Sequence, residues 1–220
     1  MEGRVNIEET DDHGNTAVIC AVKSGNPSLV GFLLSKKANV NAKNNYASSA
    51  LSCPAYSGDL DMVQVLVSGS ADLENVDNEG YTPLSTAVAF DRVKVVEYLL
   101  AENADIEHSD NSGDSPLMIA AGFNNSCVEL LLSKRAQLEH ANDQGETALV
   151  QAANMLVNVH GSMSRERSWT QYFFGPRVSF SQEQCSAVKK LIEAGADTGF
   201  LADHIDHLKT LKCLEQMNIV

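Results

Sequence analysis

The sequence predicts a solenoid built from short repeated units. A threonine or serine recurs along the chain at successive spacings of 33, 33, 33 and 32 residues. These residues are Thr16, Ser49, Thr82, Ser115 and Thr147. A glycine lies two residues before four of the five, and clusters of valine and leucine follow at matching distances. Self-similarity at a fixed period of about 20–50 residues is the sequence signature of stacked repeats.

The threonine or serine opens the first helix expected in each unit. Its hydroxyl is suited to cap that helix, and a proline in the next position has no N–H to lose. Pro83 and Pro116 stand there in the third and fourth units. Alanine pairs such as Ala120 and Ala121 let this short helix pack closely on a neighbour. The pattern therefore predicts a first helix after each threonine or serine.

The apolar clusters predict a second helix in each unit. Val95, Val96, Leu99 and Leu100 would form one buried stripe of such a helix. Aspartate and asparagine before the glycine, as at Asp77, suit a tight turn. No unit of this size buries its apolar face alone, so stability must come from stacking.

The segments Thr82-Pro83-Leu84 and Ser115-Pro116-Leu117 resemble the ankyrin-repeat signature, and the 33-residue period agrees with it. The resemblance extends from about residue 4 to about residue 198. It implies an all-α repeat solenoid in which each repeat has a β-turn finger, two antiparallel helices and a return loop. We expect one domain over residues 1–220, with repeats that begin near residues 11, 44, 77, 110 and 142.

The second repeat departs from this pattern at two positions. Ala47 stands where glycine is usual, and Pro54 lies inside the expected first helix. Proline removes a backbone hydrogen bond. We therefore expect a distorted or shortened helix.

The fifth repeat contains an insert of 27 residues between about residues 155 and 183. Its basic and aromatic residues are Arg165, Arg167, Trp169, Tyr172, Phe173, Phe174, Arg177 and Phe180. Long loops in compact domains are usually functional or disordered. Three interpretations stay open: a second interface, a cover over the end of the stack, or a self-association element that contacts an acidic groove.

The two ends of the chain carry weaker signals. Residues 5–9 match the end of a repeat, so we expect a piece of a longer array; a native start with a short cap is the alternative. Apolar residues recur every third position from Ile205 to Met217. They predict a capping helix over about residues 199–220.

The composition indicates which partners to expect. The formal net charge is −13, which disfavours nucleic acid and favours basic partners. No run of eighteen apolar residues exists, so membrane insertion is not expected. The five cysteines form no CxxC pair and are interpreted as small buried residues in a reducing compartment. We expect a cytoplasmic protein, with the nucleus as an alternative.

No pattern in the sequence indicates catalysis or a cofactor. A glycine-rich phosphate loop, a G-x-S-x-G elbow and an HExxH motif are all missing from the sequence. His204 and His207 form the best candidate for a metal site, but no third ligand of matching phase follows. We predict a non-enzyme without metal or cofactor.

The resemblance implies that partners bind the fingers and the concave face of the first helices. The predicted binding residues are Tyr46, Tyr56, Asn78, Glu79, Tyr81, Phe90, Asp114 and Phe123. Exposed aromatic residues would anchor a partner, and carboxylates would pair with arginine or lysine. Phe90 and Phe123 have an alternative role in packing under the neighbouring repeat. The predicted function is a protein-binding scaffold or adaptor; the alternative is an accessory region of a larger enzyme, channel or ubiquitin-ligase subunit.

Overall fold

The computed structural model of the protein describes residues 6–123, 126–158 and 186–199. These residues contain ten helices and no strand beyond two isolated β-bridges. The chain divides into two compact units, Met1–Pro116 and Leu117–Val220. Helix pairs and their connecting loops make up the described residues of both units, which confirms the predicted all-α repeat solenoid.

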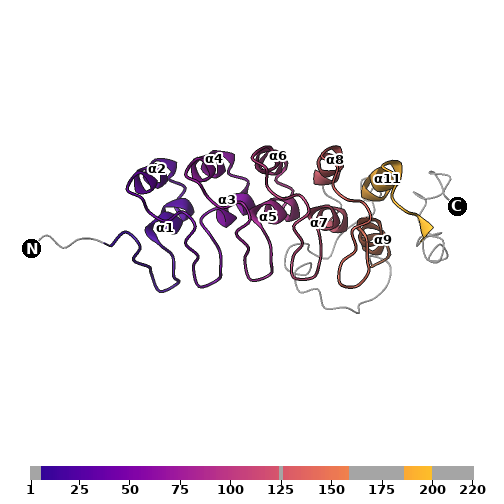
Figure 1. Ribbon diagram of the computed structural model, residues 1–220, viewed down its shortest axis with the longest axis horizontal. Coiled ribbons are helices and arrows are strands. Elements are labelled where there is room, and N and C mark those ends of the chain that lie inside the picture. The colour runs from indigo at the N-terminus through magenta and orange to yellow at the C-terminus, as the bar shows by residue number, and fades with distance from the viewer. Residues whose placement is uncertain (1–5, 124–125, 159–185, 200–220) are drawn as a thin grey trace, which may run out of the picture. The chain divides into compact units, whose positions relative to one another are not determined.

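The first unit contains three helix pairs arranged in two rows. The inner helices lie beside one another, and the outer helices form a second row (Figure 1). The loops that join one repeat to the next extend beyond the inner row as fingers, at residues 10–16, 43–49 and 76–82 (Figure 1). The inner helices are α1 (Ala17–Lys23), α3 (Ser52–Ser57) and α5 (Pro83–Ala89), and the outer helices are α2 (Pro27–Ser35), α4 (Leu60–Ser68) and α6 (Val93–Ala101).

The second unit contains α7 (Pro116–Phe123), α8 (Cys127–Ser133), α9 (Ala148–Asn158) and α11 (Ser186–Glu193). Helices α9 and α11 contact each other, as the two halves of one repeat should. Lys190 on α11 also forms an ion pair with Glu129 on α8, with 3.0 Å between the charged atoms. The predicted insert and the predicted capping helix lie outside the described residues, apart from their first few positions.

The apolar stripes predicted for the second helices form the core. Val95, Val96 and Leu99 on α6 are completely buried, whereas Leu100 is half-buried. Met62, in the position of α4 that matches Val95, is 1% exposed. Completely burying one such side chain contributes about 1.5–3 kcal/mol. The buried apolar surface of these helices therefore contributes much of the stability of the fold.

The predicted hydroxyl caps form only in part. The Thr82 hydroxyl accepts a hydrogen bond from the Ser85 N–H at 3.1 Å, as predicted. The Thr16 prediction is wrong, because its buried hydroxyl has no hydrogen-bond partner. Asn26 and Asp59, which were not predicted as caps, accept backbone N–H bonds at the starts of α2 and α4.

Pro54 shortens the first helix of the second repeat, as predicted. Helix α3 begins at Ser52 and has six residues, so Pro54 occupies its first turn. Backbone N–H groups in the first turn have no intrahelical partner, and proline therefore costs little there. Ser49 caps no helix as a consequence, and its hydroxyl lies 3.3 Å from that of Ser52.

The fingers are closed by one carboxylate or amide oxygen each. Asp77 Oδ1 accepts hydrogen bonds from the Glu79 N–H at 3.0 Å and the Tyr81 N–H at 2.9 Å. Equivalent pairs of bonds to a single oxygen occur at Asp11, Asn44, Asp110 and Asn142. This confirms the turn role predicted near Asp77 and Asp110 and shows the same turn in the other fingers.

Neighbouring fingers also bond to each other where the turn residue is glycine. The Asn45 N–H donates to the His13 carbonyl at 3.0 Å. A Cβ atom added at Gly14 would lie 2.4 Å from Asn45 Oδ1, so this close approach requires glycine. Ala47 takes the glycine position of the second finger at φ 56°, and no equivalent bond joins Asn78 to Tyr46 there.

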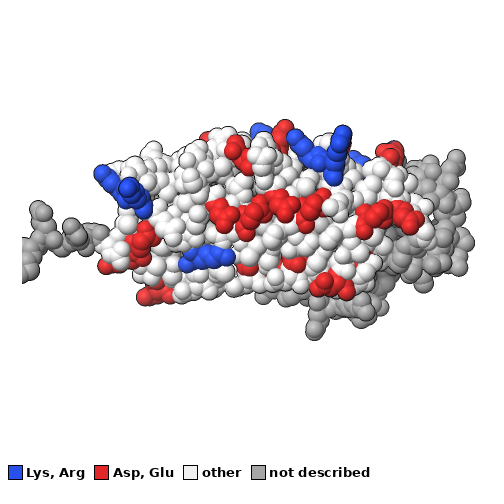
Figure 2. All heavy atoms as spheres, in the orientation of Figure 1, with Lys and Arg blue, Asp and Glu red and all other residues white. Residues whose placement is uncertain are grey.

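Return loops are joined in the same repeat-to-repeat manner. Glu74 Oε1 accepts a hydrogen bond from the Asp105 N–H of the next repeat at 2.8 Å. Glu8 and Asn41 make the matching bonds earlier in the first unit, and Glu139 does so with Asp197 in the second. Acidic side chains lie in short rows on the face shown in Figure 2. Because Glu8, Glu74 and Glu139 accept these backbone hydrogen bonds, acidic residues in this loop position have a structural role.

Ala47→Gly is expected to stabilise the protein by about 1 kcal/mol. A left-handed backbone conformation is strained for alanine and relaxed for glycine, and this gain exceeds the entropic cost of glycine. Urea unfolding measures the change. The control is Ala101→Gly at the end of α6, which should destabilise, because glycine weakens a helix. A destabilised Ala47→Gly variant would contradict the assignment of strain to this turn.

Glu74→Ala is expected to lower the free energy of unfolding by about 1 kcal/mol, because the Asp105 N–H loses its acceptor. Glu74→Gln keeps an oxygen in that position and should lose clearly less. Both changes are measured by urea denaturation. Equal losses in the two variants would show that the negative charge, rather than the hydrogen bond, matters.

Candidate functional site

The tips of the second and third fingers present four of the predicted binding residues. Tyr46 is 60% exposed, Asn78 and Glu79 are also exposed, and Tyr81 is half-buried. Because Asp77 holds the backbone N–H groups of both Glu79 and Tyr81, the third finger is ordered before any partner arrives. An ordered loop loses less conformational entropy when it binds.

A second group of predicted residues lies at the ends of the inner helices. Tyr56 on α3 is 44% exposed, and Phe90, which follows α5, is half-buried. Their ring centroids are 4.3 Å apart with an interplanar angle of 67°, a favourable edge-to-face geometry. We call Tyr56 and Phe90 the aromatic pair. Phe90 therefore packs on the preceding repeat, as its alternative role required, and still keeps part of its ring accessible.

Arg92 adjoins the aromatic pair and was not predicted. Its Nε donates a hydrogen bond to the Tyr56 carbonyl at 2.9 Å, across one repeat. Its side chain also passes close to Gly58, where an added Cβ would lie 2.9 Å from the Arg92 Cδ. The sequence pattern indicated aromatic and acidic residues for this surface, and no feature of the pattern marked Arg92.

Two predicted residues differ from the expected finger arrangement. Asp114 was expected to be exposed, but it is only 9% exposed. It lies at the base of its finger, where its N–H donates to Asp110 Oδ1 and its carbonyl accepts from the Asp110 N–H. Phe123 belongs to the second unit, where it is half-buried at the end of α7.

The interpretation of the cysteines is partly wrong. Cys127 is completely buried, as expected, but Cys20 and Cys53 are exposed. They occupy matching positions on α1 and α3, 33 residues apart. Cys185 and Cys213 lie outside the described residues, as do the predicted interface residues from Arg165 to Arg177.

The first finger contributes negative charge. Asp11, Asp12 and His13 are all exposed there. The Asn15 side chain donates to Asp11 Oδ2 at 2.9 Å, and this bond lowers the pKa of the Asp11 carboxyl. Asp11 is therefore ionised at neutral pH and adds to the negative charge at the fingers.

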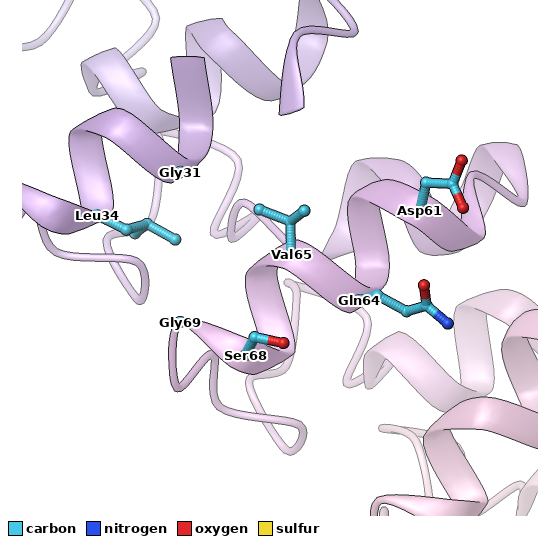
Figure 3. A pocket seen from close by; sticks show the side chains of 7 residues that line it. All are labelled: Gly31, Leu34, Asp61, Gln64, Val65, Ser68 and Gly69. Carbon is cyan, nitrogen blue, oxygen red and sulfur yellow. The ribbon is translucent and has the colours of Figure 1, made fainter. Parts of the chain in front are cut away.

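A separate hollow of about 600 Å³ opens between the outer helices α2 and α4 (Figure 3). It exists because Gly31 has no side chain where the next two repeats have Gln64 and Glu97. The lining residues are Gly31, Leu34, Asp61, Gln64, Val65, Ser68 and Gly69. This set contains no nucleophile with an adjacent base, and none of the predicted binding residues belongs to it.

Neither a clustered metal-binding set nor a membrane-spanning helix occurs in the described part of the chain. No group of three or more histidine, cysteine, aspartate or glutamate residues is arranged to hold a metal ion there. Within the same residues, no helix has the length and apolar character that a membrane span needs.

Comparison with known proteins agrees with the geometry. The family description "Ankyrin repeat" matches residues 13–45, and "Ankyrin repeats (3 copies)" matches residues 43–110 and 102–159. No curated protein shows significant similarity to the chain. The family matches span well over half of the sequence and include every described helix except α11. The chain therefore belongs to the ankyrin-repeat family.

Proposed function

We propose that this protein is an interaction module that binds an extended segment of another protein across its second and third repeats. Ankyrin repeats are generally protein–protein interaction modules and typically not enzymes. The proposed surface consists of Tyr46, Tyr56, Asn78, Glu79, Tyr81 and Phe90. It is called the partner surface below.

Exposed aromatic side chains are the main support for this proposal. Among the described residues, the exposed large hydrophobic side chains are Leu29, Phe32, Tyr46 and Tyr56. Two of the four therefore lie on the partner surface, one at a finger tip and one on an inner helix. Tyrosine offers a large contact area with a polar tip, and such residues often contribute most of the binding energy at interfaces.

The charge of the fingers supports a partner with basic residues near them. Glu79 is exposed beside Tyr81, and Asp11 and Asp12 add negative charge at the first finger. Carboxylates at the rim of an interface attract and orient basic partners, and they affect the association rate more than the final affinity. An arginine or lysine of the partner would face Glu79 in this arrangement.

Some of the predicted residues lie outside the proposed surface. Asp114 is too buried to offer its carboxylate, so the proposed surface leaves it out. Phe123 and the insert residues from Arg165 to Arg177 stay predictions for a further contact.

Partner capture from a cell lysate, read by mass spectrometry, tests the proposal with three baits. The first is the unaltered chain, and the second carries Tyr46→Ala, Glu79→Ala and Tyr81→Ala. The third carries Leu29→Ala and Phe32→Ala, which remove exposed apolar side chains outside the partner surface. We expect a protein that the first and third baits retain and the second loses.

Circular dichroism and thermal unfolding would verify that all three baits are folded. A protein retained equally by the first and second baits would contradict the proposed surface. If the third bait alone lost it, the site would lie at α2.

A further inference from the structure

We propose that the partner segment places a carboxylate on Arg92 and an apolar side chain on the adjacent aromatic pair. This inference rests on the proposed function and specifies the chemistry of one contact within it. It also adds an acidic residue to a partner segment that is expected to carry basic residues near the fingers.

The position of Arg92 is fixed by the protein itself. Its Nε donates to the Tyr56 carbonyl at 2.9 Å, and its aliphatic stem passes Gly58. The guanidinium group of arginine has five N–H donors, of which this bond uses one. Among the described residues, no hydrogen bond or ion pair engages the terminal nitrogens of Arg92.

Arg92 is one of few positively charged residues in the first unit. Residues 6–116 contain seventeen aspartates and glutamates but only six lysines and arginines. The lysines nearest to the fingers have partners within the protein: Lys23 donates to Asn15 Oδ1 at 3.0 Å, and Lys43 donates to the Val76 carbonyl. Arg92 is thus a cation beside an accessible aromatic pair, with most of its donors available to a ligand.

The available donors of Arg92 and the rings of the aromatic pair indicate which chemical groups a ligand must offer. A guanidinium group matches a carboxylate through two parallel N–H bonds, which lysine cannot reproduce. The accessible part of the Tyr56 ring offers apolar contact next to it. Burial of that contact would exclude water from the ion pair and strengthen it. The ligand class is therefore an aspartate or glutamate adjacent to an aliphatic or proline residue.

The positions of Glu79 and Arg92 predict how the partner segment runs across the partner surface. Glu79 lies at a finger tip, whereas Arg92 lies at the far end of the inner helices, between α5 and α6. A partner segment that crosses from finger to helix end would meet a carboxylate first and a guanidinium group last. Its basic residue and its acidic residue should therefore be separated along the segment.

A random-peptide display library, panned against three forms of the full chain, tests the proposal. The forms are the unaltered chain, Arg92→Gln and Lys94→Gln. Glutamine places its Nε2 where arginine has Nε, so Arg92→Gln retains a donor for the Tyr56 carbonyl and loses the charge. Lys94→Gln makes the same charge change two residues away, at an exposed position of α6.

The unaltered chain and Lys94→Gln are expected to enrich peptides with an acidic residue beside an apolar one, and Arg92→Gln is not. A synthetic copy of the most enriched peptide should bind Arg92→Gln about tenfold more weakly or worse. Changing its acidic residue to the matching amide should weaken binding to the unaltered chain and not to Arg92→Gln. That coupling would place the carboxylate on Arg92.

Two outcomes would overturn the inference and distinguish its failure from that of the proposed function. Peptides that depend on Tyr46 and Tyr81 but bind Arg92→Gln with unchanged affinity would refute the Arg92 contact and leave the partner surface standing. Peptides that depend on neither Arg92 nor the tyrosines would refute both.

Discussion

No repeat of the first unit can bury its own apolar residues, because its helices have only six to nine residues each. Burial comes from the neighbouring repeat. Met62 and Val95 are at most 1% exposed, whereas Leu29, at the matching position of the first repeat, is 41% exposed. The same dependence governs the loops, since the Asp105 N–H takes its acceptor from Glu74 of the preceding repeat.

This stacking decides which residues remain available to a partner. Side chains between repeats are used for burial, and several carboxylates are used to join return loops. The finger tips and one side of the inner helices are left, and Tyr46, Tyr56 and Cys53 lie there. Arg92 ties the third repeat to the Tyr56 carbonyl, and its terminal nitrogens, which have no partner among the described residues, are the donors of the proposed contact. The proposed binding surface and the contacts between repeats therefore depend on the same helices and fingers.

The sequence predicted the features that depend on local chemistry and on the period. The helix pairs, the aspartate-closed fingers and the shortened α3 all follow from residues such as Asp77 and Pro54 together with a 33-residue repeat. It did not predict the features that depend on how one repeat faces another. The buried Thr16 hydroxyl, the low exposure of Asp114, the exposed Cys20 and the Arg92 contact belong to this second group. A one-dimensional pattern assigns a residue to a helix or finger but does not show which neighbour covers it.

We propose that a partner binds the fingers and inner helices of the second and third repeats. Hydrogen–deuterium exchange on the complex with the captured partner would locate the contact. We expect slower amide exchange at residues 43–49 and 76–82 and in α3 and α5, with little change along the outer helices α2 and α4. Slower exchange confined to α2 and α4, around the hollow that Gly31 leaves open, would contradict it.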